Sequence, residues 1–501
     1  MDTNQVKVWT RLIGTPGDDF SRGISVGSDD TVYVTGTANS DVFLTKYFPN
    51  GIKAWTKFIG TQSLENGGDI CIAADGSIYV TGSTAGNLDG AANSGSADAF
   101  LTKYDGNGNR VWTKLIGTPS WDDGSSLTVG LDGSIYVSGW TEGDLDGEMN
   151  SGISAFITKY DATGNRAWTK LIGTSASKCL ATGLDGSIYI TGYTPMNLDG
   201  EINSGGVDAF LTKYDVNGNR AWTKLIGTSG DDIGYGLTVG LDGSIYVTGS
   251  TAGNLDGEMN SGAVDAFLSK YDVNGNRTWT KLIGTSDDEV GYGLTIGAEG
   301  SIYLAGHTED NLDGEVNSGG YSSYSYFGSG FLNEYDINGN EAWTKLIGTS
   351  VKEDLGVAGS ADGSIYVTGG TLGDLDGETN SGGRDGFLIK FRPASTSSDT
   401  LDVIVDLFGN VSMLKGLIEV DNGTVHTLSY NGTVFNYAEV DPLITTVVRN
   451  GEFTAEFAQE IADAYPSAAG IKYNTVVTLF GVAAIDDLLI SVAGADGFYV
   501  S

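Results

Sequence analysis

Short runs in which apolar and polar residues alternate recur along most of the chain. In one complete unit these runs are Gly236–Gly240, Ser244–Gly249, Ala266–Tyr271 and Thr278–Ile283, and Asp-Gly or Asn-Gly pairs separate several of them. A period of two, with β-branched and aromatic residues, predicts strands, and Asp, Asn and Gly suit the tight turns between them. Each unit is therefore predicted to be an antiparallel sheet of four strands.

A tryptophan marks the same strand position in successive units. Its copies are Trp9, Trp55, Trp112, Trp168, Trp222, Trp279 and Trp343, at spacings of 46 to 64 residues. Units that repeat at a fixed period cannot bury their own faces alone, so they stack on their neighbours. Seven four-stranded units without helices predict an all-β seven-bladed β-propeller, and we expect the repeated tryptophans to pack between its blades.

The two ends of the repeat region each lack one strand. The region opens with Val8–Ile13, which has the sequence of an outermost strand, and it closes with Phe387–Phe391, which has the sequence of a third strand. We expect Val8–Ile13 to complete the last blade, built from Leu355–Phe391, because a closed ring leaves no exposed sheet edge.

The recurring segments WTK-IGT, DGSIYVTG and DAFLTKYD run through Val8–Arg392. They resemble the bacterial seven-bladed β-propeller repeat (SBBP) family. This resemblance implies the propeller fold and a frequent extracellular or cell-surface setting, and it implies no single reaction. Residues 1–392 are accordingly assigned to the propeller.

The composition changes after Arg392, and the repeat does not resume. Residues 393–400 (PASTSSDT) are predicted to be a linker, and residues 401–501 a small α+β domain. Strand-like runs fill much of this domain, while apolar residues at helical spacing predict a helix over Glu452–Tyr465, which ends before Pro466.

The chain is strongly acidic, with 64 Asp and Glu against 27 Lys and Arg and a formal charge of −37. Nucleic acid and anionic membrane surfaces are therefore excluded as expected partners, and no apolar run is long enough for a membrane-spanning helix. Acidic residues precede the innermost strands, on the side where the Asp-Gly loops also emerge, so we expect one strongly acidic face. These residues are Asp18-Asp19, Asp122-Asp123, Asp231-Asp232, Asp287-Asp288-Glu289 and Glu353-Asp354.

The loop between second and third strands has a repeated sequence such as DLDGEMNSG, which starts at Asp144. Side-chain oxygens at alternate positions beside a glycine could wrap a hard cation, so Ca²⁺ is the candidate cofactor. The alternative is that Asp and Asn fold the loop through Asx turns. The candidate ligands are Asp144, Asp146, Glu148, Asn150, Asp199, Glu201, Asn203, Asp256, Glu258, Asn260, Asp313, Glu315, Asp374, Asp376 and Glu378.

Catalytic constellations are scarce. His307 and His426 lie in different predicted domains, which argues against a histidine-based zinc site or catalytic pair. The only cysteines, Cys71 and Cys179, occupy non-equivalent repeat positions and do not indicate a disulfide. Arginines at one equivalent turn position are expected to form surface ion pairs; they are Arg110, Arg166, Arg220 and Arg277. We nominate no catalytic residue.

Several aromatic residues fall outside the repeated tryptophan set. Trp121 and Trp140 are candidate ligand-binding residues, and Tyr193, Tyr235 and Tyr292 share their region of the repeat. An insertion, YSSYSYF, adds the candidates Tyr321, Tyr324 and Tyr326. Exposed aromatic rings beside amide and carboxyl groups suit sugar stacking, and Tyr/Ser-rich loops are adaptable contact surfaces.

Together these features predict an extracellular, non-enzymatic binding or structural protein that uses an acidic propeller face. If the Asp-Gly loops bind Ca²⁺, this face also carries calcium. The expected partner is a glycan, a surface protein or another copy of the chain. The final residues, ADGFYVS, resemble a bacterial type I secretion signal. The alternative is a carbohydrate-active enzyme, a glycoside hydrolase or lyase, which would need a carboxylate pair that the sequence does not single out.

Overall fold

A computed structural model of the chain describes residues 5–150, 152–317, 328–351 and 355–393, together with five short strands between residues 417 and 493. The chain divides into two compact units. One contains Trp9–Tyr47 and Lys53–Arg392, and the other contains Met1–Val8, Phe48–Ile52 and Pro393–Ser501. In the described ranges the regular structure is entirely β, without a helix that could cross a bilayer.

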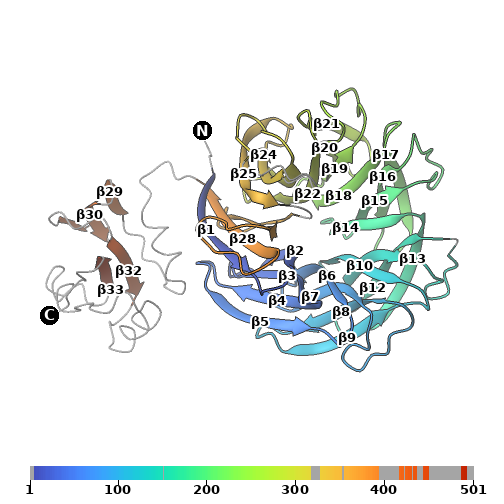
Figure 1. Cartoon of the computed structure of the whole chain (residues 1–501), viewed down its shortest axis with the longest axis horizontal. Coiled ribbons are helices and arrows are strands. Elements are labelled where there is room, and N and C mark those ends of the chain that lie inside the picture. The colour runs from blue at the N-terminus through green and yellow to red at the C-terminus, as the bar shows by residue number, and fades with distance from the viewer. Residues whose placement is uncertain are drawn as a thin grey trace. The chain divides into compact units, whose positions relative to one another are not determined.

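The larger unit is a seven-bladed β-propeller (Figure 1). Blade 1 contains β2 (Asp19–Val26), β3 (Val32–Ala38), β4 (Asp41–Tyr47) and β5 (Lys53–Ile59). Blade 2 contains β6 (Glu65–Ile72), β7 (Ile78–Thr84), β8 (Asp98–Tyr104) and β9 (Arg110–Ile116). Blade 3 contains β10 (Asp122–Val129), β11 (Ile135–Thr141), β12 (Ser154–Tyr160) and β13 (Arg166–Thr174). Neighbouring strands in each blade are antiparallel.

The next blades follow the same order. Blade 4 contains β14 (Ala176–Thr182), β15 (Ile188–Thr194), β16 (Asp208–Tyr214) and β17 (Arg220–Ile226). Blade 5 contains β18 (Asp232–Val239), β19 (Ile245–Thr251), β20 (Asp265–Tyr271) and β21 (Arg277–Ile283). Blade 6 contains β22 (Glu289–Ile296), β23 (Ile302–Thr308), β24 (Gly328–Tyr335) and β25 (Glu341–Val351).

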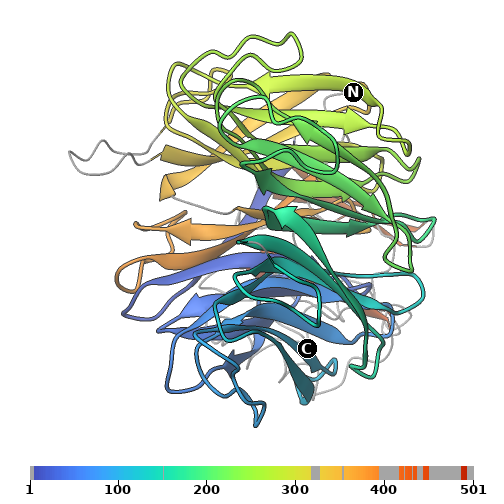
Figure 2. The same cartoon turned by 90° about the vertical axis from the view of Figure 1, so that its right-hand side faces the viewer.

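Blade 7 joins the two ends of the repeat region. It contains β26 (Gly356–Gly359), β27 (Ile365–Thr371), β28 (Asp385–Pro393) and, on the outer side of β28, the N-terminal strand β1 (Gln5–Ile13). In Figures 1 and 2 the orange β28 accordingly lies beside the blue N-terminal strands. The predicted closure is confirmed, and a single residue pair, Val351↔Thr371, also links blade 6 to blade 7.

The repeated tryptophans pack at the blade junctions, as predicted. Trp112 of blade 2, for example, contacts a buried cluster that combines Tyr79 and Leu101 of its own blade with Ile135 and Val137 of blade 3. Its indole and the Tyr79 ring lie 6.0 Å apart between centroids. Because each blade presents the same apolar faces, seven such clusters form the core of the ring.

The innermost strands begin earlier than the sequence pattern indicates. In blade 5 the expected start is Gly236, whereas β18 begins at Asp232. The amide of Asp232 donates to the carbonyl of Val207 in blade 4 at 2.7 Å, which holds the strand's first residue in place. A β-bulge between Gly234 and Gly236 then inserts Tyr235. The bulge breaks the period of two, so the pattern hides the first half of the strand.

In the second unit the described residues form two small antiparallel sheets. One contains β29 (Leu417–Asp421), β30 (Thr424–Tyr430) and β31 (Thr433–Asn436), and the other contains β32 (Ile444–Asn450) and β33 (Asp487–Ala493). The α+β fold of residues 401–501 stays a prediction. The predicted helix Glu452–Tyr465 and the predicted linker, apart from Pro393, lie outside the described residues.

Candidate functional site

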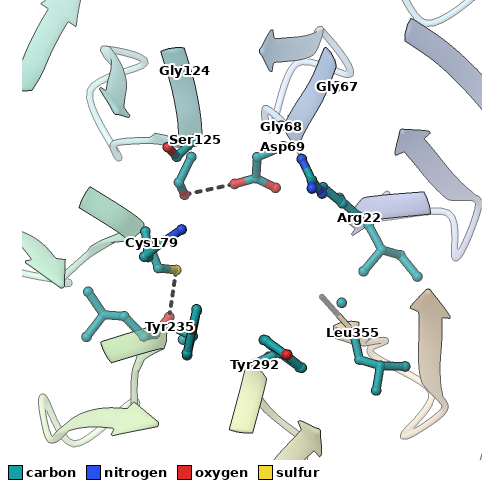
Figure 3. Close-up of a pocket in the computed structure, with 18 of the residues that line it drawn as sticks. Arg22, Gly67, Gly68, Asp69, Gly124, Ser125, Cys179, Tyr235, Tyr292 and Leu355 are labelled. Carbon is teal, nitrogen blue, oxygen red and sulfur yellow. Dashed lines mark hydrogen bonds between the residues drawn. The ribbon is translucent and has the colours of Figure 1, made fainter. Parts of the chain in front are cut away.

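The innermost strands surround a cavity of about 280 Å³ at the centre of the propeller (Figure 3). Its walls come from β2, β6, β10, β14, β18 and β22 and from the segment Leu355–Val357 at β26. Every blade therefore contributes to this site, which we call the central channel.

The β-bulge of the innermost strand supplies the most prominent channel side chains. In blades 1 to 6 a register shift inserts one extra residue near the middle of this strand. The extra residues, with the equivalent residue of blade 7, line the cavity as a ring that we call the bulge ring. Its members are Arg22, Gly68, Ser125, Lys178, Tyr235, Tyr292 and Leu355.

The bulge ring is chemically diverse although the repeats around it are nearly identical. The second strand reads IYVTGST in blades 2 and 5, and the third reads DAFLTKY in blades 2 and 4. At the bulge, by contrast, blades differ in charge, size and polarity. The innermost strands as a whole also vary more than the second and third strands, so the channel lining does not follow the sevenfold repeat.

The two cations of the ring face the channel from blades three positions apart. Arg22 and Lys178 are the basic residues among the described innermost strands. The Lys178 ammonium lies 5.7 Å from the ring centroid of Tyr235 and 5.9 Å from that of Tyr193, and the Arg22 guanidinium lies 4.9 Å from that of Phe20. These cation–π contacts hold the positive charges beside aromatic faces.

The channel has an aromatic side and a polar side. Tyr235 and Tyr292 meet edge to face with centroids 5.1 Å apart, and Leu355 continues this apolar wall. Across the cavity in Figure 3 lie Ser125 and Asp69. A fixed aromatic wall opposite hydrogen-bonding groups is an arrangement that can bind the apolar face and the hydroxyls of a sugar at once.

Asp69 is the buried carboxylate of the polar side. Its Oδ2 accepts hydrogen bonds from the Ser126 hydroxyl at 2.9 Å and the Leu127 amide at 3.1 Å, and its Oδ1 accepts from the Ile70 amide at 2.8 Å. Burial raises the pKa of this carboxyl group. Because three donors occupy its oxygens, Asp69 joins blade 2 to blade 3 and fixes the shape of the wall.

Cys179 also lines the channel. Burial raises the pKa of its thiol to about 12, so the reactive thiolate is not formed near neutral pH. Its Sγ lies 3.8 Å from the carbonyl oxygens of Leu180 and Leu237. Both cysteines are free thiols.

Only some of the aromatic residues predicted to bind a ligand line the channel. Trp140, on β11, lines the channel, as do Tyr235 and Tyr292. Trp121 does not line this cavity; its side chain is exposed and its backbone bridges to Ala97. The remaining candidates lie in the insertion, outside the described residues, and stay predictions; they are Tyr321, Tyr324 and Tyr326.

The Asp-Gly loops are folded against the outermost strand of their own blade. In blade 3, Asp146 pairs with Arg166 at 2.6 Å and accepts a hydrogen bond from the Thr169 hydroxyl at 2.5 Å, while Glu148 pairs with Lys170 at 2.9 Å. The predicted arginine ion pairs are confirmed here and at three equivalent pairs, Arg110–Asp89, Arg220–Asp199 and Arg277–Asp256.

These loops also contain the Asx contacts of the alternative interpretation. Asp144 Oδ1 accepts from the Asn150 amide at 2.7 Å, and the Asn150 side chain donates to the Thr141 carbonyl at 3.0 Å. The other candidate ligands occupy the corresponding loop positions, with left-handed φ at Asp199, Asp256, Asp313 and Asp376. Within the described ranges no three His, Cys, Asp or Glu side chains converge on a metal position. Calcium binding by the loops stays a prediction.

The expected acidic face is smaller than the sequence suggests, because one residue in four of the five acidic groups is buried. Asp19, Asp122, Asp232 and Glu289 are fully buried. Each accepts from the backbone amide and hydroxyl of a threonine four residues earlier; for Asp122 the partner is Thr118, at 2.6 and 2.9 Å. These carboxyl groups cap the connection between blades. The prediction that they line a surface is wrong.

A second acid joins the buried one at five blade junctions. It is the first residue of the third strand in the preceding blade, and the pairs are Asp41/Glu65, Asp98/Asp122, Asp208/Asp232, Asp265/Glu289 and Asp385/Asp19. Between blades 3 and 4 serines, Ser154 and Ser175, replace both acids. At that junction both acids are therefore absent.

Protonation is the chemical consequence of this pairing. Burial raises the pKa of Asp98, and burial together with the charge of Asp98 raises the pKa of Asp122. Burial likewise raises the pKa of Glu289 to about 7. Within the described structure one buried oxygen on each of Asp98 and Asp122 has no hydrogen-bond partner. A proton on either Asp98 or Asp122 would remove the repulsion between the two carboxylates and would give their unpaired oxygens a hydrogen-bond donor.

Comparison with known proteins agrees with the fold. The family described as Beta-propeller repeat (SBBP) matches residues 8–43 and 221–256, which confirms the resemblance that the repeat sequences indicate.

Two curated relatives share part of the chain. The regulatory protein FlaEY of Caulobacter vibrioides is 27% identical over 355 residues, which cover 62% of this chain and 37% of that protein. An uncharacterized WD repeat-containing protein, L264, of Acanthamoeba polyphaga mimivirus is 23% identical over 288 residues, which cover 52% of this chain and 18% of that protein. The matched regions thus span well under half of each relative.

Similar solved structures include the Dos1 propeller, with a TM-score of 0.42 and 10% identity over 77% of this chain and 95% of that one. Another is YCF48 bound to D1 peptide, with a TM-score of 0.42 and 11% identity over 78% of this chain and 97% of that one.

Proposed function

We propose that this chain, which carries SBBP beta-propeller repeats, is an extracellular, non-enzymatic binding protein that takes a glycan into its central channel. The observation that carries the proposal is the bulge ring. Seven equivalent positions, which hold six residue types, converge on one cavity, whereas the second and third strands of the blades repeat almost unchanged.

The size and chemistry of the channel support a small polar ligand. Its volume of about 280 Å³ lies just below the range for sites that hold drug-sized molecules, about 300 to 1,000 Å³. Tyr235, Tyr292 and Trp140 provide stacking surface, and Asn66 and Ser125 provide hydrogen-bonding groups. This combination suits one or two sugar residues, with the rest of the glycan outside the channel. Aromatic residues of the insertion, Tyr321 among them, are candidate contacts for that outer part.

The extracellular setting rests on composition. A charge of −37, two cysteines in 501 residues and abundant Gly and Asp favour a secreted acidic protein. Detection of the full chain in culture medium, and its loss from the medium when residues 495–501 are deleted, would support export through a type I system.

The proposal is tested by blocking the channel. Ser125→Phe places a large side chain on the half-buried channel wall, and Leu131→Phe makes a matched change at a position that is 77% exposed in the β10–β11 turn. On a glycan array we expect the unmodified chain and Leu131→Phe to bind the same sugars, and Ser125→Phe to lose them while it melts at a similar temperature. Undiminished binding by Ser125→Phe would place the site elsewhere.

A carbohydrate-active enzyme is the second candidate because two carboxylates, Asp69 and Asp123, line the same channel. A raised pKa, such as burial gives Asp69, suits a general acid, and a second carboxylate could act as base or nucleophile. The three donors on Asp69 argue against this role, since they hold both of its oxygens. Release of reducing ends from a polysaccharide, abolished by Asp123→Asn, would establish the enzyme instead.

A further inference from the structure

The central channel contains a positive charge without a protein counter-ion. Lys178 is exposed to the channel, and no carboxylate of the described chain lies within ion-pair distance of its ammonium group. Some lysines of the propeller have such partners: Lys159 pairs with Asp132 at 3.6 Å and Lys213 with Asp185 at 3.4 Å. Lys178 differs from them because its unpaired ammonium group belongs to a residue that lines the central channel.

The position of Lys178 favours an anionic ligand group over a structural role. Its bulge position is glycine in blade 2 and serine in blade 3, so the strand does not require a long side chain there. Rings of Tyr193 and Tyr235 flank the ammonium group and keep it in the channel. Arg22 adds a second cationic side chain to the channel lining, three blades away.

Two carboxylates, Asp69 and Asp123, also line the channel. Asp69 directs both oxygens to donors of blades 2 and 3. Within the described chain neither carboxylate forms an ion pair with Lys178, so its ammonium group stays available to a ligand carboxylate.

We propose that the channel ligand is a carboxylated sugar, of the uronic-acid type, whose carboxylate binds Lys178 while its ring stacks on Tyr235. This inference rests on the proposed glycan-binding function and adds the ligand class. A carboxylate beside an ammonium group forms a charge-assisted hydrogen bond, and the aromatic wall takes the apolar face of the ring. Ser125, on the opposite side, is placed to bind hydroxyl groups.

The test compares oligogalacturonate with neutral galacto-oligosaccharides of the same length, and with a sulfated counterpart, by calorimetry on the full chain. We expect the carboxylated sugar to bind about 10-fold more tightly than the neutral one, as for one charge-assisted contact, and to weaken as salt is added. Lys178→Met should remove this preference yet keep the weaker binding of the neutral sugar, and Lys178→Arg should retain it. Lys170→Met, at a partly exposed lysine outside the channel that has its own carboxylate partner, Glu148, is the matched control.

The outcomes separate the two proposals. Equal affinity for carboxylated and neutral sugars, or an unchanged preference in Lys178→Met, would overturn the carboxylate inference and leave glycan binding intact. A preference for the sulfated sugar would also overturn it. If no sugar binds the unmodified chain, the proposed function fails and the inference fails with it.

Discussion

Asp98 and Asp122 are both fully buried at the junction of blades 2 and 3, where the amide of Asp122 donates to the carbonyl of Ala97 at 2.8 Å. The junction thus holds two acids in one dry site. Four other junctions also carry an acid at both positions. Burial raises the pKa of Asp98 and of Asp122, so the conformational stability of this junction depends on pH.

The first prediction concerns pH. In the folded chain burial raises the pKa of Glu289 from 4.5 to about 7, so the folded state holds this proton more tightly than the unfolded state does. Its contribution is complete below about pH 4.5 and is lost as the pH rises through 7, at a cost of about 3 kcal/mol. We expect Glu289→Gln, which needs no proton, to flatten the fall of melting temperature between pH 5 and 8.

The control for this measurement is Glu299→Gln, at an exposed position in the turn before β23. It should follow the unmodified chain at every pH. Melting curves of Glu289→Gln that stay parallel to those of the unmodified chain would show that the buried acids do not titrate in this range.

The second prediction concerns closure. Deletion of residues 1–15 removes β1 and exposes the outer edge of β28, whose backbone groups then lose their partners. Trp9 also leaves the cluster that joins blade 7 to blade 1. We expect a large drop in melting temperature and a loss of cooperativity in thermal unfolding followed by circular dichroism. An unchanged melting curve would mean that the ring is stable without its closing strand.

The third prediction separates two costs of replacing a turn glycine. Gly164 has φ +83°, and a Cβ there would lie 3.1 Å from the Trp112 ring of the neighbouring blade, whereas Gly133 has φ +75° and open space. Gly133→Ala should therefore cost only backbone strain, about 1 kcal/mol. Gly164→Ala should cost about 1 to 3 kcal/mol more, because overpacking is added to the strain. Chemical denaturation measures both; equal losses would mean that the indole moves aside freely.

The fourth prediction concerns calcium in the Asp-Gly loops. In blade 3 a bound ion would compete with Arg166 for Asp146 and with Lys170 for Glu148, because both carboxylates already form ion pairs. If the loops bind calcium, millimolar Ca²⁺ should raise the melting temperature and EDTA should lower it. Each site should add about 2.7 kcal/mol to the free energy of unfolding at a Ca²⁺ concentration 100 times the Kd. Asp146→Asn should weaken that response at one loop. A melting curve unaffected by either addition would support the Asx-turn interpretation.

The sequence by itself determined the propeller. Period-two strands, turn dipeptides and the seven tryptophans specify four-stranded blades and their number, since each blade must bury the same apolar faces against its neighbour. The missing strand at each end likewise specified closure through Val8–Ile13. Local patterns suffice for these features because they depend on residues that recur at fixed spacing.

Only the tertiary structure decided where chemistry gathers. Tyr235 and Lys178 are each inserted by a bulge in the innermost strand of their own blade, and each bulge breaks the period of two. The alternation of apolar and polar residues therefore does not show that both side chains line the channel. The variation of this position among the repeats was the available signal. Burial of Asp122 beside Asp98 was equally hidden, because whether a carboxylate faces water or a neighbouring blade depends on packing between segments distant in the sequence.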